Sequence, residues 1–194
     1  MNNTLVQIQL FYEIASIIGN SPYLEEMAKE SLSAYLHKLN CSTGIILRRT
    51  LDDTGITRFE PVVTMPRRAN ESDALKASLA YVPERLDFEA CKEFLQTLPL
   101  SFEVDGGKHG YVMRLQGFGL LLLIKAGDPF EESFVRSLTR LNKKLADACL
   151  VCVHSEEITK INQALTQEIR VRLRAEGDLK RVLDELESRV QERT

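Results

Sequence analysis

Apolar residues recur at helical spacing along the N-terminal part of the chain. Residues 5–18 carry two apolar stripes, and a helix that is apolar on two sides needs cover on both. One side can face the domain's own core, and the other can face either a partner subunit or a further element of the same domain. A second amphipathic helix is predicted from Pro22 to about Asn40, with Ser21 as its N-cap. The two stripes of the first helix are Leu5, Ile8, Tyr12 and Ala15, and Val6, Leu10, Ile14 and Ile17.

Short apolar runs separated by turn residues predict an antiparallel sheet in the middle of the chain. The run at 120–124 is apolar throughout, so its strand should lie centrally in the sheet with both faces covered. Pro61 cannot donate to a strand ladder, so its strand should lie at a sheet edge or carry a bulge. Short helices are predicted at 70–81 and 88–98. The predicted strands are 44–49, 57–65, 100–105, 111–115 and 120–125.

A long helix is predicted to begin at Asp128-Pro129 and to continue without a convincing break to Thr194. Its first part carries one narrow apolar stripe, which suits packing on a sheet or against a sister helix. This stripe consists of Phe134, Leu138, Leu141, Leu145, Ala148 and Cys152.

The tail of that helix has a coiled-coil pattern, with apolar residues at about seven-residue intervals on a polar background. A long amphipathic helix cannot cover its own stripe, so we expect a second copy to bury it in a parallel homodimer. The alternative, a helix that folds back onto its own domain, lacks a turn signal. We therefore divide the chain into a domain at 1–153 and a coiled coil at 154–194. Arg172, the polar exception, is expected to weaken the coil locally and keep it switchable. The predicted seam is Ile158, Ile161, Leu165, Ile169, Arg172, Leu179, Val182, Leu186 and Val190.

The composition narrows the classes of partner. The 194 residues are 44% apolar and 27% charged, as in an ordinary globular protein. The net charge of −3 provides no bulk positive field to hold nucleic acid. No apolar run approaches the roughly 20 residues of a membrane span. The first residues lack the basic region of a secretory signal, and we expect the four cysteines to be reduced thiols of a cytoplasmic protein.

Candidate chemistry is sparse. Cys149 and Cys152 have redox or metal spacing, but they fall inside a predicted helix without a second pair, so packing is the favoured interpretation. No catalytic set and no metal site is expected. A small-molecule pocket is expected between the sheet and the helical insert at 70–98, although ordinary core packing is the alternative role for its residues. The residues predicted to line it are Tyr81, Phe88, Phe94, Tyr111 and Met113.

Several stretches resemble parts of bacterial sensor proteins. Residues 168–179, from Glu-Ile-Arg-Val-Arg-Leu to Glu-Gly-Asp-Leu, look like a signalling helix. Residues 186–194 resemble the linker that enters the dimerisation helices of sensor histidine kinases, or a following PAS domain. The preceding part is similar to GAF sensor domains in its hairpin at 111–124, its Pro-Phe-Glu-Glu-Ser-Phe segment at 129–134 and the helix that follows. The resemblance implies an α+β fold, with a GAF-like central antiparallel sheet flanked by helices and a long C-terminal coiled-coil helix.

The resemblance also implies a function. It indicates a cytoplasmic sensory and dimerisation module of a two-component sensor histidine kinase, with the output domain beyond Thr194. The ligand stays unknown, because the Asn-Lys-x-Asp-Glu signature of cyclic-nucleotide-binding GAF domains is absent and no cysteine precedes a histidine as in bilin-binding relatives. Two alternatives remain open: a ligand-free protein-docking and dimerisation module, and a thiol-based redox enzyme on a GAF fold.

Overall fold

The computed structural model describes residues 2–67, 73–104 and 106–192. The chain divides into two compact units, residues 1–153 and residues 154–194. Among the described residues, no helix combines the length and the hydropathy that a membrane span requires.

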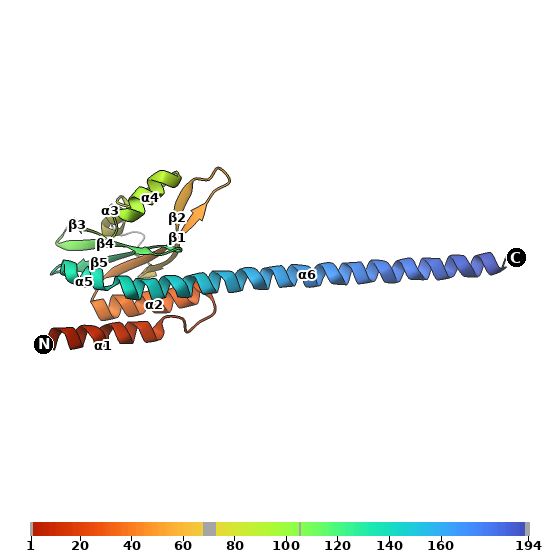
Figure 1. Ribbon diagram of the computed structural model, residues 1–194, viewed down its shortest axis with the longest axis horizontal. Coiled ribbons are helices and arrows are strands. Elements are labelled where there is room, and N and C mark those ends of the chain that lie inside the picture. Colours follow the sequence, from red (N-terminus) through yellow and green to blue (C-terminus); the bar gives the residue numbers. More distant parts are fainter. Residues whose placement is uncertain (1, 68–72, 105, 193–194) are drawn as a thin grey trace. The chain divides into compact units, whose positions relative to one another are not determined.

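Within the described residues, five strands form an antiparallel sheet in the order β2-β1-β5-β4-β3 (Figure 1). The central strand β5 is buried from Leu120 to Ile124, which confirms the prediction from its apolar run. Both expectations for Pro61 are confirmed, because β2 is an edge strand and its pairing with β1 shifts register beside that proline. The strands are β1 (Thr43–Leu51), β2 (Thr57–Met65), β3 (Leu100–Val104), β4 (Lys108–Leu115) and β5 (Gly119–Ala126).

Each face of the sheet carries its own core layer. Helices α1, α2, α5 and the first part of α6 lie over one face of the sheet, and α3 and α4 lie over the other (Figure 1). Each group of helices contributes side chains to the core layer on its own face. Strand β4 contributes to both layers, because Tyr111 and Met113 face the first and Val112 faces the second. The helices are α1 (Asn2–Ile17), α2 (Leu24–Leu39), α3 (Asp73–Leu79), α4 (Phe88–Gln96), α5 (Glu132–Ser137) and α6 (Thr139–Glu192).

Several helix boundaries differ from the sequence predictions. The helix predicted from Asp128 begins at Glu132, and α3 and α4 end at Leu79 and Gln96 rather than at residues 81 and 98. Two further differences have a clear local cause. Helix α2 begins at Leu24 rather than at Pro22, because the Ser21 hydroxyl accepts from the Tyr23 N–H (3.3 Å) and donates to Glu26 (2.8 Å) in a turn before the helix. The helix predicted from Asp128 is interrupted between α5 and α6. There, the Ser137 hydroxyl donates to the Phe134 carbonyl (2.6 Å) and accepts from Gln7 of α1 (2.7 Å). Side-chain bonds of this kind compete with the helix backbone and end or bend it. Of the helix predicted at 70–81, residues 70–72 lie outside the described part of the chain.

The apolar stripe predicted for the first part of the long helix packs against the sheet. Leu138, Leu141, Leu145 and Cys152 are buried, and Phe134 and Ala148 are half-buried. By contrast, the apolar residues of α6 beyond residue 153 are exposed.

Candidate functional site

A cleft with a volume of about 390 Å³ lies between α4 and the sheet. Its floor comes from β1, β2 and β4, and its wall comes from one side of α4. The lining residues are Arg49, Leu51, Thr57, Phe88, Cys91, Lys92, Leu95, Gln96 and Arg114.

Strand alternation places two arginines on the floor of this cleft. Ile45 and Leu47 of β1 belong to the core layer under α3 and α4, so Arg49 points to the same side. On β4, Val112 belongs to that layer, and Arg114 follows it two residues later. The sheet is therefore apolar where the helices cover it and cationic where the cleft opens.

The wall of the cleft is tied to the sheet where α4 begins. Thr57 of β2 and Leu86 exchange two backbone hydrogen bonds, of 2.7 Å and 3.0 Å. The next residue, Asp87, caps α4 by accepting from the Ala90 N–H at 2.8 Å. Because these contacts fix the first turn of α4, the residues of that turn keep a defined position beside the floor.

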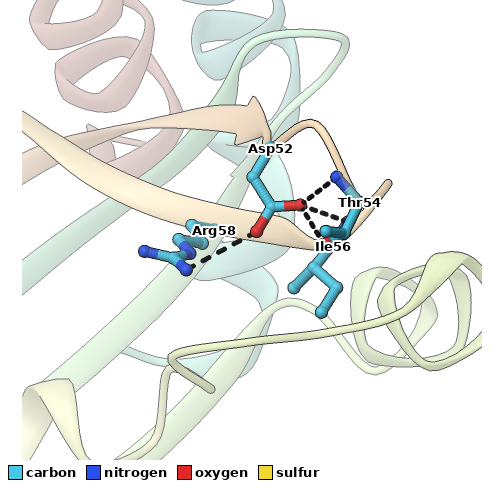
Figure 2. Close-up of polar contacts among 4 residues, drawn as sticks. All are labelled: Asp52, Thr54, Ile56 and Arg58. Atoms are coloured by element: carbon cyan, nitrogen blue, oxygen red, sulfur yellow. Dashed lines mark hydrogen bonds and ion pairs between the residues drawn. The ribbon is translucent and has the colours of Figure 1, made fainter.

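The hairpin between β1 and β2 is held by Asp52 (Figure 2). Its carboxylate accepts from the Thr54 hydroxyl (2.6 Å), the Thr54 N–H (3.0 Å) and the Ile56 N–H (3.0 Å), and it pairs with Arg58 at 3.5 Å. The Thr54 hydroxyl bond is the main cause that lowers the pKa of Asp52. The hairpin end that borders the cleft at Leu51 and Thr57 is thus anchored by its own hydrogen bonds.

The cleft is positively charged. Arg49, Lys92 and Arg114 line it, and none of the described lining residues carries a carboxylate. Within the described ranges, none of these three cations forms a salt bridge, whereas Arg58 on the neighbouring strand pairs with Asp52. Two large apolar side chains also border the cleft and are exposed: Phe88 at 73% and Leu51 at 66%. The cleft can therefore offer both charge and apolar contact to a small molecule.

The five residues predicted to line a pocket are not brought together. Phe88 lines the cleft, while Tyr81 stacks on Phe102 (ring centroids 3.8 Å apart) and Phe94 packs near Phe59 (6.1 Å) on the same side of the sheet. Tyr111 and Met113 lie in the opposite core layer.

Those two β4 side chains contact the segments that follow the sheet. The Tyr111 hydroxyl accepts from the Phe130 N–H at 2.7 Å. The Met113 sulfur accepts from the Asn142 amide at 3.4 Å, and Asn142 in turn accepts from the Tyr35 hydroxyl at 2.9 Å. The two residues therefore connect β4 to the segment just before α5 and to α6, rather than to the insert.

The cleft arginines were missed by the sequence reasoning. The signal in the sequence was that Arg49 and Arg114 each follow buried apolar residues at every second position of their strands, so both arginines face the same side as those residues. It became visible only with the strand order, which sets β1 and β4 on either side of β5.

The cysteines do not form a reactive pair. Burial raises the pKa of Cys41 and that of Cys149 to about 12 each. Cys41 packs on the helical layer of α2 and α6, while Cys91 lies in the layer on the other face of the sheet. Cys149 and Cys152 are both buried in the first layer. No group of three potential metal-ligating side chains occurs in the part of the chain that the structure describes.

The residues predicted for the coiled-coil seam all lie on α6. The eight apolar ones are 48–65% exposed. Arg172 pairs with Glu168 one turn earlier, at 2.5 Å.

Comparison with known proteins rests on structure. No family model matches the sequence, and no curated protein matches it. The GAF domain of a phosphoenolpyruvate-protein phosphotransferase from Coxiella burnetii superposes with a TM-score of 0.53 and 15% identity, over 81% of this chain and 99% of that one. The GAF domain of a protein assigned as a sensor histidine kinase from Pseudomonas syringae pv. tomato gives a TM-score of 0.50 and 17% identity, over 84% and 95%. The sheet order, the two core layers and these likenesses together show that the chain has an α+β, GAF-like fold.

Proposed function

We propose that this chain is the sensory and dimerisation module of a signal-transduction protein. In this proposal the GAF-like unit of residues 1–153 receives a signal, and α6 relays it through a parallel coiled coil to an output domain. The observation that carries the proposal is the row of exposed apolar residues at heptad spacing on a helix whose first part is built into the domain core.

The exposed row supports a homodimer. Exposed apolar side chains at a seven-residue repeat are the pattern that a second helix buries by knobs-into-holes packing. Val151, which is 67% exposed, stands seven residues before Ile158 and extends the same row towards the domain. Two parallel copies would bring both C-terminal ends to the same side, as a shared output requires.

Strand β4 supplies a physical route for the signal within the domain. Arg114 faces the cleft, while Tyr111 and Met113 on the same strand bond to Phe130 and Asn142. A ligand that shifts β4 would therefore change the packing of α5 and the first turns of α6. We propose that the ligand favours one of two packings, and that the tail follows as a population shift.

A histidine kinase is the output that we propose. Residues 168–194 resemble the signalling helix and linker that precede kinase dimerisation helices, and one structural neighbour is the GAF domain of a protein assigned as a sensor histidine kinase.

A ligand-free docking module is the second candidate. The observation in its favour is the exposed apolar face of α1, which includes Leu5, Val6, Ile8 and Tyr12. Retention of a small molecule by protein purified from its own host, detected by native mass spectrometry, separates this candidate from the sensory one. The third candidate, a thiol redox enzyme, is disfavoured because raised pKa values keep Cys41 and Cys149 protonated.

Analytical ultracentrifugation of the whole chain tests the relay. We expect a dimer for the wild type and a monomer for a Leu165→Glu and Leu179→Glu double variant. At each of these two positions, a glutamate of one chain would then face the same glutamate of the other chain. Val171→Glu is the matched control, since Val171 is an exposed apolar residue of α6 that lies outside the predicted seam. A monomeric wild type, or a double variant that stays dimeric, would refute the coiled-coil relay.

A further inference from the structure

We infer that the cleft between α4 and the β1–β2 hairpin binds a small organic anion, a carboxylate or phosphate that carries an apolar or aromatic group. This inference rests on the proposed sensory function and names the class of ligand that the domain would detect. Its basis is the gathering of three cations and two exposed apolar side chains around one cleft.

The positions of the two arginines suit a small anion. Leu120 of β5 pairs with Leu47 of β1 on one side and with Arg114 of β4 on the other. Arg49 stands two residues beyond Leu47 on β1. With neighbouring strands about 4.8 Å apart and a rise of about 3.4 Å per residue, the Cα atoms of the two arginines are roughly 12 Å apart. A smaller hollow next to the cleft is lined by the same Arg49 and Arg114. Both arginines therefore border a common space, and their side chains are long enough for both guanidinium groups to reach one carboxylate or phosphate held between them.

The charges that line the cleft favour a bound anionic ligand over a carboxylate of the protein itself. Like charges repel, and Arg49, Lys92 and Arg114 face the cleft without a carboxylate among its lining residues. The whole chain carries a net charge of −3, so the positive charge of the cleft is local and does not reflect the charge of the whole chain. Guanidinium groups bind planar oxyanions through paired hydrogen bonds, which makes arginine suited to carboxylates and phosphates.

The apolar contacts favour an organic ligand over a bare ion. Phe88 on α4 and Leu51 on β1 both line the cleft and are both exposed. Cys91 and Leu95 of α4 add buried apolar surface to the wall of the cleft. The volume of about 390 Å³ lies within the range of small-molecule sites, and three cations are too few for the extended track of a nucleic acid.

The experiment follows the binding of defined probes to the whole 194-residue chain by two-dimensional NMR. The probes are 4-phenylbutyrate and phenyl phosphate, with neutral 4-phenylbutyramide and inorganic phosphate as comparisons. We expect at least one aromatic anion to shift the resonances of the cleft residues saturably, and the neutral amide and the bare ion to bind at least tenfold more weakly. The carboxylate and phosphate arms show which anionic group the site prefers.

Variants assign the contacts. Arg49→Gln and Arg114→Gln should each weaken the better aromatic anion about tenfold, and Phe88→Ala should weaken it without affecting inorganic phosphate. Arg140→Gln is the matched control, since it removes the same charge from an exposed residue of α6 outside the cleft. All four side chains are exposed, so the fold should be kept, which thermal unfolding verifies.

Three outcomes would overturn the inference: no saturable shift with either aromatic anion, equal binding of the neutral amide, or unchanged affinity in both arginine variants. None of these outcomes affects the oligomeric state that the ultracentrifugation experiment tests. A failure of the ligand class is therefore distinguishable from a failure of the proposed relay.

Discussion

The buried contact between Tyr35 and Asn142 provides a quantitative test of how α6 is held to the domain. The Tyr35 side chain is fully buried and Asn142 is 3% exposed, and the hydroxyl donates to the amide oxygen at 2.9 Å. Burial raises the pKa of Tyr35 well above its ordinary value, so the hydroxyl remains a donor at neutral pH. Removal of one partner leaves the other buried and unsatisfied. Asn142→Leu and Tyr35→Phe should therefore each destabilise the fold by about 1–3 kcal/mol.

The double variant distinguishes this explanation from a simple loss of packing. When both partners are apolar, no buried polar group remains at the contact, so the double variant should cost about 0.5–3 kcal/mol less than the sum of the single variants. Urea unfolding at one fixed protein concentration measures all four proteins, since the proposed dimerisation would make stability depend on concentration. Tyr23→Phe, the same change at an exposed residue, should have an effect within about 0.5 kcal/mol. Additive single and double effects would refute the reasoning.

Three further predictions concern single sites. A Cβ at residue 119 would lie 1.9 Å from the Leu47 carbonyl oxygen, so Gly119→Ala should destabilise the sheet by about 1–3 kcal/mol in thermal unfolding, and an unchanged melting temperature would contradict the close approach. Gly177 lies in open space on a helix, so Gly177→Ala should instead raise the helicity measured by circular dichroism. The folded-state pKa of Asp52 is lowered, so its charge adds stability above the ordinary carboxyl pKa of 3.8, and that stability is lost as the pH falls through the lower folded value. The excess stability of the wild type over Asp52→Asn should accordingly be full at neutral pH and vanish in acid, and a difference independent of pH would exclude the charge as its source. Cys149 should react with a thiolate reagent at pH 8 far more slowly than free cysteine, as judged by peptide mass spectrometry; equally fast labelling would show that the buried thiol is accessible.

Local patterns in the sequence predicted the sheet well because each depends on a few neighbouring residues. Pro61 lacks a donor wherever it lies, which is enough to predict an edge or a bulge. The apolar run at 120–124 is incompatible with a strand that faces water, which is enough to place it centrally.

The features that were missed depend on contacts between distant parts of the chain. The break after Ser137 involves Gln7 of α1, which no local pattern around residue 137 reveals. Alternation along β4 correctly separates Tyr111 and Met113 from Val112, but it does not say which face the helical insert covers. The cleft is defined by residues 49, 92 and 114, and these meet only after the strand order and the position of α4 are fixed.

The edge strand β2 has a consequence for assembly. An open edge displays backbone groups that can recruit a strand from another molecule. Here Pro61 removes one N–H from that edge, and the shift of register opposite Ile46 and Leu47 disturbs the regular spacing of the others. The opposite edge, β3, spans only Leu100–Val104 and offers little length for pairing. Growth of the sheet from one molecule into the next is thus discouraged at both margins.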